Sequence, residues 1–197
     1  MGMTVTKIID GLWQWGTTTP GSDRGPRWSS YVEAPDAVVV IDPRLPDDAD
    51  EIDRFWRAFD GDVERRGHPV RVLLTGEADL PSVAAFRDRH DATVAGAVGS
   101  RTDGIGPIAD GTSPATGIVC RTLTAPTGDR RGMFLLHEHA AEVIGDFPDA
   151  PEHRRTLVTH VIDSTNLRAE KTGETATVFR WLLSSIDEPI DLAVTTA

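Results

Sequence analysis

The sequence predicts an α/β fold in which two β-sheets pack face to face with helices on the outside. Three observations lead to this expectation. Apolar runs typical of strands alternate with stripes typical of helices, each early helix leads into another apolar strand, and several short strand patterns follow. At 197 residues the chain is long enough for one domain, residues 1–197, with a substantial core.

The first third of the chain predicts strands and turns. Thr6–Trp15 carries apolar residues on both sides of an Asp-Gly pair, which predicts two short strands joined by a turn. Thr17–Arg27 is rich in Thr, Pro, Gly and Ser, as loops are. Trp28–Glu33 predicts another strand, and Ala37–Ile41 is entirely apolar, as expected of a buried strand.

The clearest helix follows. Its apolar residues lie at offsets 0, 3, 4, 7 and 11, one stripe of an amphipathic helix: Ile52, Phe55, Trp56, Phe59 and Val63. Acidic residues precede the stripe, and Gly67 follows it, as helix ends favour. The helical spacing of the aromatic residues favours core packing over a ligand cage.

The middle of the chain predicts a strand at Val70–Thr75, a helix at Pro81–His90 and a strand at Thr93–Val98. In the helix, Val83, Ala84 and Phe86 are expected to face inward. After a loop-rich stretch, the remaining expected elements are strands at Gly117–Leu123, Met133–Leu136 and Ala141–Ile144, an irregular polar stretch to Glu170, a helix at Thr175–Ile186 and a strand at Ile190–Thr195.

The composition is strongly acidic. The net charge is -11 and the pI is about 4.9, which argues against nucleic acid or an anionic membrane as partner. Lys7 and Lys171 are the only lysines among 20 basic residues. An acidic, lysine-poor surface is typical of halophilic proteins, in which salt screens the self-repulsion. A GC-rich genome, which also replaces lysine by arginine, is the alternative.

Cys120 is the only cysteine, so the chain has no intramolecular disulfide and no paired-cysteine metal motif. Its apolar neighbours predict a buried core residue. The N-terminus lacks the basic and apolar regions of a signal peptide, and no apolar run approaches the length of a membrane span. We therefore expect a cytoplasmic protein.

Several segments, in this order, resemble the metallo-β-lactamase fold. They are Asp10–Trp13, the strand and turn Val38–Pro43, the strand end Val72–Thr75, the turn Ala125–Gly128 and the strand end Val143–Asp146. The resemblance extends over nearly the whole chain. It implies an αββα four-layer sandwich, with two mixed β-sheets between outer helices, and a metal-dependent hydrolase as ancestor.

The metal ligands of that family are largely missing. The family places a His-x-His-x-Asp-His motif directly after the strand that Val72–Thr75 resembles, and its two cations generate a hydroxide nucleophile. The matching positions here are Gly76, Ala78, Leu80 and Pro81. Gly128 matches a further histidine, the chain end offers no histidine, and only Asp146 matches a usual ligand. Zinc would be the family cofactor, but the resemblance predicts no zinc site here.

A rebuilt site is a second possibility. Glu77 and Asp79 lie two residues apart in the same loop, and with Asp146 and Asp42 they offer oxygen ligands for Mg²⁺, Ca²⁺ or Mn²⁺. The competing interpretation is that they are solvated loop acids in an acid-rich chain. His137 and His139 have a chelating spacing, although a solvated hairpin turn is the simpler interpretation. The role of His160 stays open.

Two functional classes follow. The favoured one is a binding or interaction protein without catalytic activity, built on a degenerate metallo-β-lactamase scaffold. Its partner would be a small molecule or a protein, and homo-oligomers are possible. The alternative is a hydrolase with a rebuilt carboxylate or single-metal site. A third hypothesis is an anion site formed by Arg101, Arg130 or Arg131. In the binding-protein class, the loop Thr17–Arg27 with Trp13, Trp15 and Trp28 would cover a cleft. The mouth of this cleft would be formed by Gly76–Ser82, Gly99–Gly106, Gly128–Arg131 and the segment after Asp146.

Overall fold

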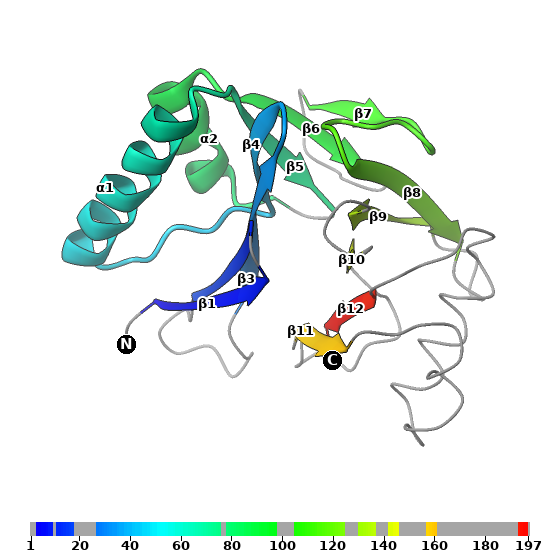
Figure 1. Cartoon of the computed structure of the whole chain (residues 1–197), viewed down its shortest axis with the longest axis horizontal. Helices are drawn as coiled ribbons and strands as arrows, with labels where there is room; N and C mark the ends of the chain where they lie inside the picture. Colours follow the sequence, from blue (N-terminus) through cyan, green and yellow to red (C-terminus); the bar gives the residue numbers. More distant parts are fainter. Residues whose placement is uncertain are drawn as a thin grey trace.

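A computed structural model gives the fold. It describes residues 3–9, 11–17, 27–75, 78–97, 105–124, 130–136, 142–145, 157–160 and 193–196. Within these ranges the strands form a seven-stranded sheet, a three-stranded sheet and a two-stranded pair, and two helices lie between strands of the largest sheet (Figure 1). The structure is therefore a mixed α/β fold, as the sequence predicts.

The seven-stranded sheet is mixed, and its strands lie side by side in chain order. The strands are β1 Thr4–Ile9, β2 Leu12–Thr17, β3 Arg27–Ala34, β4 Ala37–Ile41, β5 Val70–Leu74, β6 Thr93–Ala97 and β7 Gly106–Ile108. Pairing is antiparallel from β1 to β4 and parallel from β4 to β7. The predicted strands up to β6 are confirmed. The segment of β7 was predicted as loop, because three residues that include Gly and Pro give no periodic signal.

Both helices occur where the sequence predicts them, as connections between parallel strands. Helix α1 spans Ala49–Arg66 and helix α2 spans Leu80–His90. The Asp48 side chain caps α1 by accepting a hydrogen bond from the Glu51 N–H at 3.0 Å. Gly67 ends α1 with a left-handed φ of 66°, a conformation that glycine adopts without strain.

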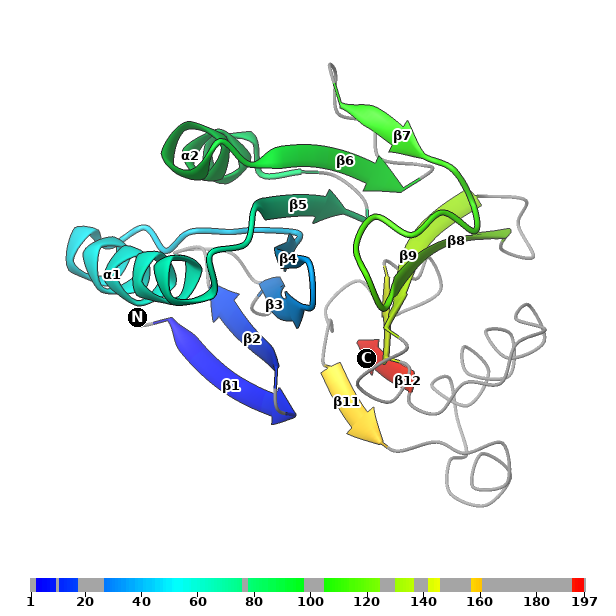
Figure 2. The same cartoon turned by 45° about the horizontal axis from the view of Figure 1, so that its top comes forward.

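The helices pack on one face of the sheet (Figure 2). Phe55, Trp56 and Phe59 of α1 and Phe86 of α2 are buried together with side chains of β4 and β5. The rings are in mutual contact, with 4.9 Å between the centroids of Trp56 and Phe86 and 5.1 Å between those of Phe59 and Phe86. The interpretation of the aromatic stripe as core packing is confirmed.

One predicted inward residue of α2 faces outward. Val83 and Phe86 are buried, but Ala84 is exposed, and Ser82 is buried in its place. In a helix of 11 residues with a weak apolar stripe, the sequence pattern alone does not determine which side of the helix faces the sheet. The hydrogen bonds that Ser82 makes with neighbouring segments, described below, explain why a polar residue faces inward.

The second core lies on the opposite face of the seven-stranded sheet. Leu12, Val39 and Ile41 of that sheet pack there with Ile118 and Phe134. These last two come from β8 Ile118–Thr124 and β9 Arg130–Leu136, which form an antiparallel sheet with β10 Glu142–Gly145. Cys120 of β8 is fully buried in this cluster, as predicted.

The last described strands are β11 Leu157–His160 and β12 Ala193–Thr196, which pair antiparallel. The stretch up to Glu170 was predicted as irregular, so β11 corrects that prediction. Its four residues become a strand only through a partner more than 30 residues away, which local patterns do not report. Arg130 and Arg131 lie in β9. The predicted helix Thr175–Ile186 lies outside the described residues.

Neither helix in the described part of the chain combines the length and the apolar character needed to cross a membrane.

We predict that the aromatic core dominates stability. Phe86→Ala removes a fully buried ring and is expected to lower the free energy of unfolding by about 3–5 kcal/mol, through lost burial and a cavity. Leu80→Ala in the same helix is the control, because Leu80 is 58% exposed, and should change stability by less than about 0.5 kcal/mol. Urea denaturation measures both, and equal effects of the two substitutions would contradict this packing.

A second prediction concerns the contact between the helices. Arg89 of α2 donates hydrogen bonds of 2.9 and 2.6 Å to the Asp60 carboxylate of α1, and they hold the pKa of that carboxyl below its usual value. The pKa of Asp60 is lower in the folded state than in the unfolded state, where it is about 4. The ionised carboxylate therefore stabilises the fold above about pH 4, and this stabilisation is lost as the pH falls through the folded-state pKa. Asp60→Asn should therefore cost about 0.2–1 kcal/mol near pH 7.

The stability difference between wild type and Asp60→Asn should shrink towards zero as pH falls below about 4. Denaturation curves at a series of pH values measure it. If the stability difference between wild type and Asp60→Asn instead grew as the pH fell below about 4, the pairing of Asp60 with Arg89 would be contradicted.

Candidate functional site

The parallel strands β4 and β5 end at the same edge of the sheet. Ile41 of β4 is paired with Leu73 of β5, so Asp42 and Thr75 follow the two strands side by side. In α/β proteins ligands commonly bind at the carboxyl ends of such strands. This edge is therefore the place where the sequence predicts a site.

Asp42 joins the two strand ends. Its Oδ1 accepts a hydrogen bond from the Thr75 N–H at 2.9 Å, and its Oδ2 accepts one from the Thr75 hydroxyl. Thr75 is 2% exposed, so both of its donors would be costly to leave unpaired. Asp42 has a φ of 49°, a left-handed conformation that Asp tolerates better than most residues and that turns the chain at the end of β4. Asp42 therefore acts as a connector between β4 and β5.

The neighbouring strands are attached to the same turn. The Ser29 hydroxyl of β3 donates a hydrogen bond to the Asp42 carbonyl at 2.8 Å and accepts one from the Arg44 N–H at 3.0 Å. The Trp15 indole N–H of β2 donates to the Arg44 carbonyl at 2.7 Å. The turn after β4 is thus fixed by side chains from β2, β3 and β5.

The start of α2 is attached in the same way. The Ser82 hydroxyl donates a hydrogen bond to the Asp79 carboxylate and accepts one from the Leu45 N–H at 2.8 Å. Ser82 is 3% exposed. Asp79 lies directly before the first residue of α2, so its interaction with Ser82 stays within the first turn of the helix. The serine links this turn to the segment after β4.

The predicted site residues separate into two groups. Asp42 and Asp79 are described, and both accept hydrogen bonds from neighbouring side chains. Glu77 and Asp146 lie outside the described residues, so their predicted approach to Asp42 and Asp79 stays a prediction. His137 and His139 also lie outside the described residues. His160 is the last residue of β11, opposite Ala193.

The donors at this edge differ from those that zinc prefers. The described residues between Thr75 and Ser82 are Ala78, Asp79, Leu80 and Pro81, which offer one carboxylate and neither imidazole nor thiolate. Across the described ranges no three His, Cys, Asp or Glu side chains gather as they would around a metal ion. The described residues therefore do not fit the zinc ligand set of the family's hydrolases.

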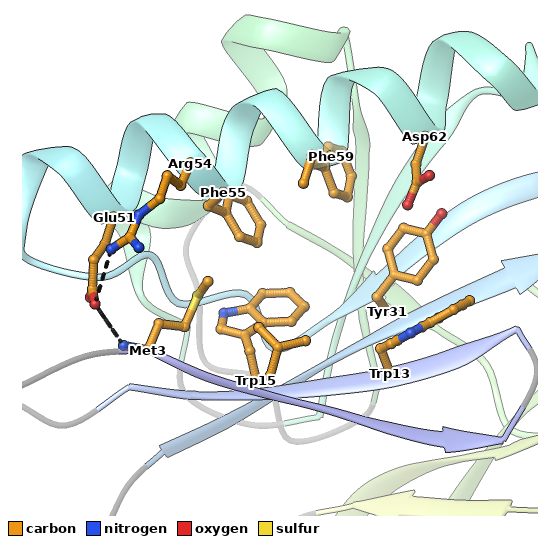
Figure 3. Close-up of a pocket in the computed structure, with 11 residues that line it drawn as sticks. Met3, Trp13, Trp15, Tyr31, Glu51, Arg54, Phe55, Phe59 and Asp62 are labelled. Carbon is orange, nitrogen blue, oxygen red and sulfur yellow. Dashed lines mark hydrogen bonds and ion pairs between the residues drawn. The ribbon is translucent and has the colours of Figure 1, made fainter.

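The structure contains a cavity that the sequence analysis did not identify. It has a volume of about 390 Å³ and lies between α1 and the strands β1–β3 (Figure 3). Its lining consists of Met3, Val5, Trp13, Trp15, Tyr31, Glu51, Arg54, Phe55, Ala58, Phe59 and Asp62. Trp13 and Trp15 therefore face α1, which corrects their expected place in a cover over the strand ends. Their two-residue spacing in β2 was the signal for a shared aromatic face.

Tyr31 gives this cavity a buried polar group. The residue is 6% exposed, and its hydroxyl is itself buried, beside the Asp62 carboxylate and the Arg66 guanidinium. Burial raises the pKa of this hydroxyl to about 12, and the nearby Asp62 carboxylate acts in the same direction. The phenol is therefore protonated at neutral pH and able to donate a hydrogen bond.

No family model and no curated protein sequence matches the chain. Solved structures do resemble it. The metallo-β-lactamase FIM-1 from Pseudomonas aeruginosa, in its mono-zinc form, is 21% identical with a TM-score of 0.52, and the match covers 73% of this chain and 68% of that one. An NDM_FIM-1-like metallo-β-lactamase from Erythrobacter litoralis, also mono-zinc, is 13% identical with a TM-score of 0.53, and the match covers 96% and 91%.

Sequence identities this low show that the proteins share a fold, but they do not show that they share an activity. The parallel strands β4 and β5, the helices that connect the parallel strands and the turn at Asp42 agree with the segments that carried the sequence resemblance. On the likeness to these solved structures, the chain has the metallo-β-lactamase fold.

Proposed function

We propose that this chain is a binding protein without catalytic activity, built on the metallo-β-lactamase fold. The observation that carries the proposal is the use of Asp42 and Asp79 as hydrogen-bond acceptors for Thr75 and Ser82. The Asp42 bonds attach the end of β4 to the residue after β5, and the Asp79 bond orients the Ser82 hydroxyl that accepts from the Leu45 N–H. Carboxylates used in this way serve the architecture of the edge, and a catalytic metal would have to compete with buried donors for them.

The sequence supports the same proposal. Gly76, Ala78, Leu80 and Pro81 stand where the family motif has its metal ligands, and none of these side chains binds a borderline cation. The finer architecture belongs to the proposal as well. We propose that the three-stranded sheet and the β11–β12 pair form the second layer of an αββα sandwich, with the remaining chain completing its outer face.

A hydrolase with a rebuilt site is the second candidate. One observation favours it: the structural neighbours are mono-zinc enzymes of the same fold. This candidate requires Glu77, Asp79 and Asp146 to converge on one ion at about 2.0–2.6 Å.

Metal content separates the two candidates. Purified full-length protein is incubated with zinc, manganese or magnesium in high salt, which suits its acidic composition, then passed through a desalting column and analysed for bound metal. The binding-protein proposal predicts well below one equivalent of each metal, because Asp42 and Asp79 already accept hydrogen bonds from Thr75 and Ser82. The same samples should not hydrolyse a chromogenic cephalosporin.

About one equivalent of metal that disappears in Asp146→Ala would establish the rebuilt site and overturn the proposal. Glu142→Ala is the matched control, since it removes an acid from β10 that the hydrolase candidate does not use. Metal that Asp146→Ala and Glu142→Ala reduce by the same small fraction would indicate nonspecific binding to an acidic surface, which agrees with the proposal.

Substitution of Asp42 tests its structural role. Asp42→Ala leaves the buried Thr75 N–H and hydroxyl without acceptors and should cost about 1–3 kcal/mol of unfolding free energy. Asp42→Asn should keep most of the stability, because its amide oxygen accepts from the N–H, the threonine hydroxyl accepts from the amide, and Asn also tolerates a positive φ. Chemical denaturation in the presence of a chelator measures both variants.

A metal-ligand role for Asp42 gives a different pattern. Zinc would then stabilise the wild type and neither variant, because Asn and Ala both remove the ionised ligand. That pattern would contradict the structural role.

A further inference from the structure

We propose that Lys7 protects the edge of the seven-stranded sheet from pairing with a second copy of the chain. Lys7 lies in β1, so the inference concerns a different part of the sheet from the strand ends and is independent of the function proposed there. Four observations carry it: the position of β1 in the sheet, the composition of the strand, the surroundings of its lysine and the shift in register that follows the lysine.

Strand β1 forms one edge of the sheet (Figure 2), and among the described strands it is hydrogen-bonded only to β2. In an antiparallel pair, alternate residues of an edge strand direct their N–H and C=O groups away from the partner strand. The opposite edge is β7, which has three residues and contains Pro107. Since β1 has six residues and no proline, it is the edge that a second chain could extend.

The sequence of β1 favours such pairing. It reads Thr-Val-Thr-Lys-Ile-Ile, and every residue except the lysine is β-branched. The residues Thr4–Lys7 are exposed, and Val5 has 56% of its surface exposed. An uncharged run of this length and composition at the edge of a sheet promotes association between chains. Lys7 is the one residue that brings a charge into this run.

A second β1 would bring Lys7 against side chains that do not accept its charge. Lys7 lies on the same face of the strand as Val5, and its ammonium is 5.8 Å from the centroid of the Trp13 ring, opposite it in β2. If two copies paired antiparallel about a two-fold axis perpendicular to the sheet, residues of the same face would lie opposite one another. Lys7 would then face Met3, Val5 or Lys7 of the second copy, none of which carries a carboxylate.

The Glu51 carboxylate of α1 lies beside the start of β1, but it is already engaged. It accepts hydrogen bonds of 3.0 and 3.1 Å from the Met3 N–H and lies 3.7 Å from the Arg54 guanidinium. The lysine of a second copy would approach this carboxylate next to a like charge. An added strand would therefore remove water from the ammonium without replacing it by an equivalent partner, which is costly.

Lysine suits this role better than arginine. An ammonium group is compact and strongly hydrated, whereas a guanidinium is more weakly hydrated and is common in interfaces. Lys7 is one of only two lysines among the 20 basic residues of the chain. The net charge of -11 also keeps copies apart, but salt screens this repulsion. The cost of removing water from Lys7 is local, so we expect it to persist at high salt.

The register of β1 limits the edge further. The strand pairs regularly with β2 from Thr4 to Lys7, and the register shifts between Lys7 and Ile9. Irregularities of this kind bend an edge strand and interrupt the ladder that a further strand would need. The regular edge is therefore Thr4–Lys7, and the lysine occupies its last position.

The test replaces the lysine in the full-length protein. Lys7→Val completes the β-branched run and should strengthen self-association at least about tenfold relative to the wild type. The difference should be present at low salt and at about 1 M salt. Sedimentation velocity over a series of protein concentrations measures the association, and amide hydrogen exchange should show added protection at Thr4–Lys7 in the associated variant.

Two further variants separate the edge from general effects of charge and apolar surface. Arg87→Val removes a positive charge and adds the same side chain at an exposed position of α2, so it should associate like the wild type. Val5→Lys combined with Lys7→Val returns a lysine to the same face of β1 and should restore the behaviour of the wild type. Circular dichroism verifies that each variant is folded, and Lys7→Thr replaces Lys7→Val if the valine disturbs the fold.

The proposal is overturned if Lys7→Val associates no more strongly than the wild type, or if Arg87→Val associates as strongly as Lys7→Val. It is also overturned if association leaves hydrogen exchange in β1 unchanged, or if the wild type itself pairs through β1 in about 1 M salt. None of these measurements depends on metal at the strand ends, so a failure here is distinguishable from a failure of the proposed function.

Discussion

The packing of the aromatic face of α1 against the sheet is the constraint on which the rest of the structure depends. Parallel strands need a long crossover connection, and α1 supplies it between β4 and β5. Phe55, Trp56 and Phe59 bury this connection against both strands. Because the strands then run in the same direction, their carboxyl ends meet at one edge, where Asp42 reaches Thr75.

This packing creates two environments with opposite chemistry. At the strand ends, Asp42, Ser29, Thr75 and Ser82 form hydrogen bonds with one another or with neighbouring backbone groups. Between α1 and β1–β3 the walls are mainly aromatic and apolar. Polar groups that are already hydrogen-bonded hold the strand ends together. These hydrogen bonds underlie the proposed structural role of the carboxylates at the strand ends.

The sequence predicts those elements whose signal is local. The five apolar offsets of α1, the apolar run of β4 and the glycine that ends α1 depend on residues within a few positions of one another, and the structure confirms all three. The metallo-β-lactamase resemblance likewise rested on short segments in order, and solved structures of that fold support it.

Features that depend on distant partners could not be predicted in the same way. β11 exists through its pairing with β12, and Ser82 faces inward because Leu45, 37 positions away in sequence, donates to it. The sequence suggests Asp42 as a metal ligand, because a carboxylate directly after a buried strand can bind a cation. Its bond to Thr75 depends on the register of β4 against β5 and on the left-handed φ of the turn. The cavity at Tyr31 depends likewise on how α1 crosses three strands.

Anomalous diffraction from crystals of the full-length protein grown with zinc tests the central claim most directly. The account predicts no ordered zinc at the strand-end edge and an Asp42 carboxylate still bonded to Thr75. A well-occupied zinc peak coordinated by Asp42 or Asp79, with Thr75 or Ser82 released, would contradict it and assign this edge to metal chemistry.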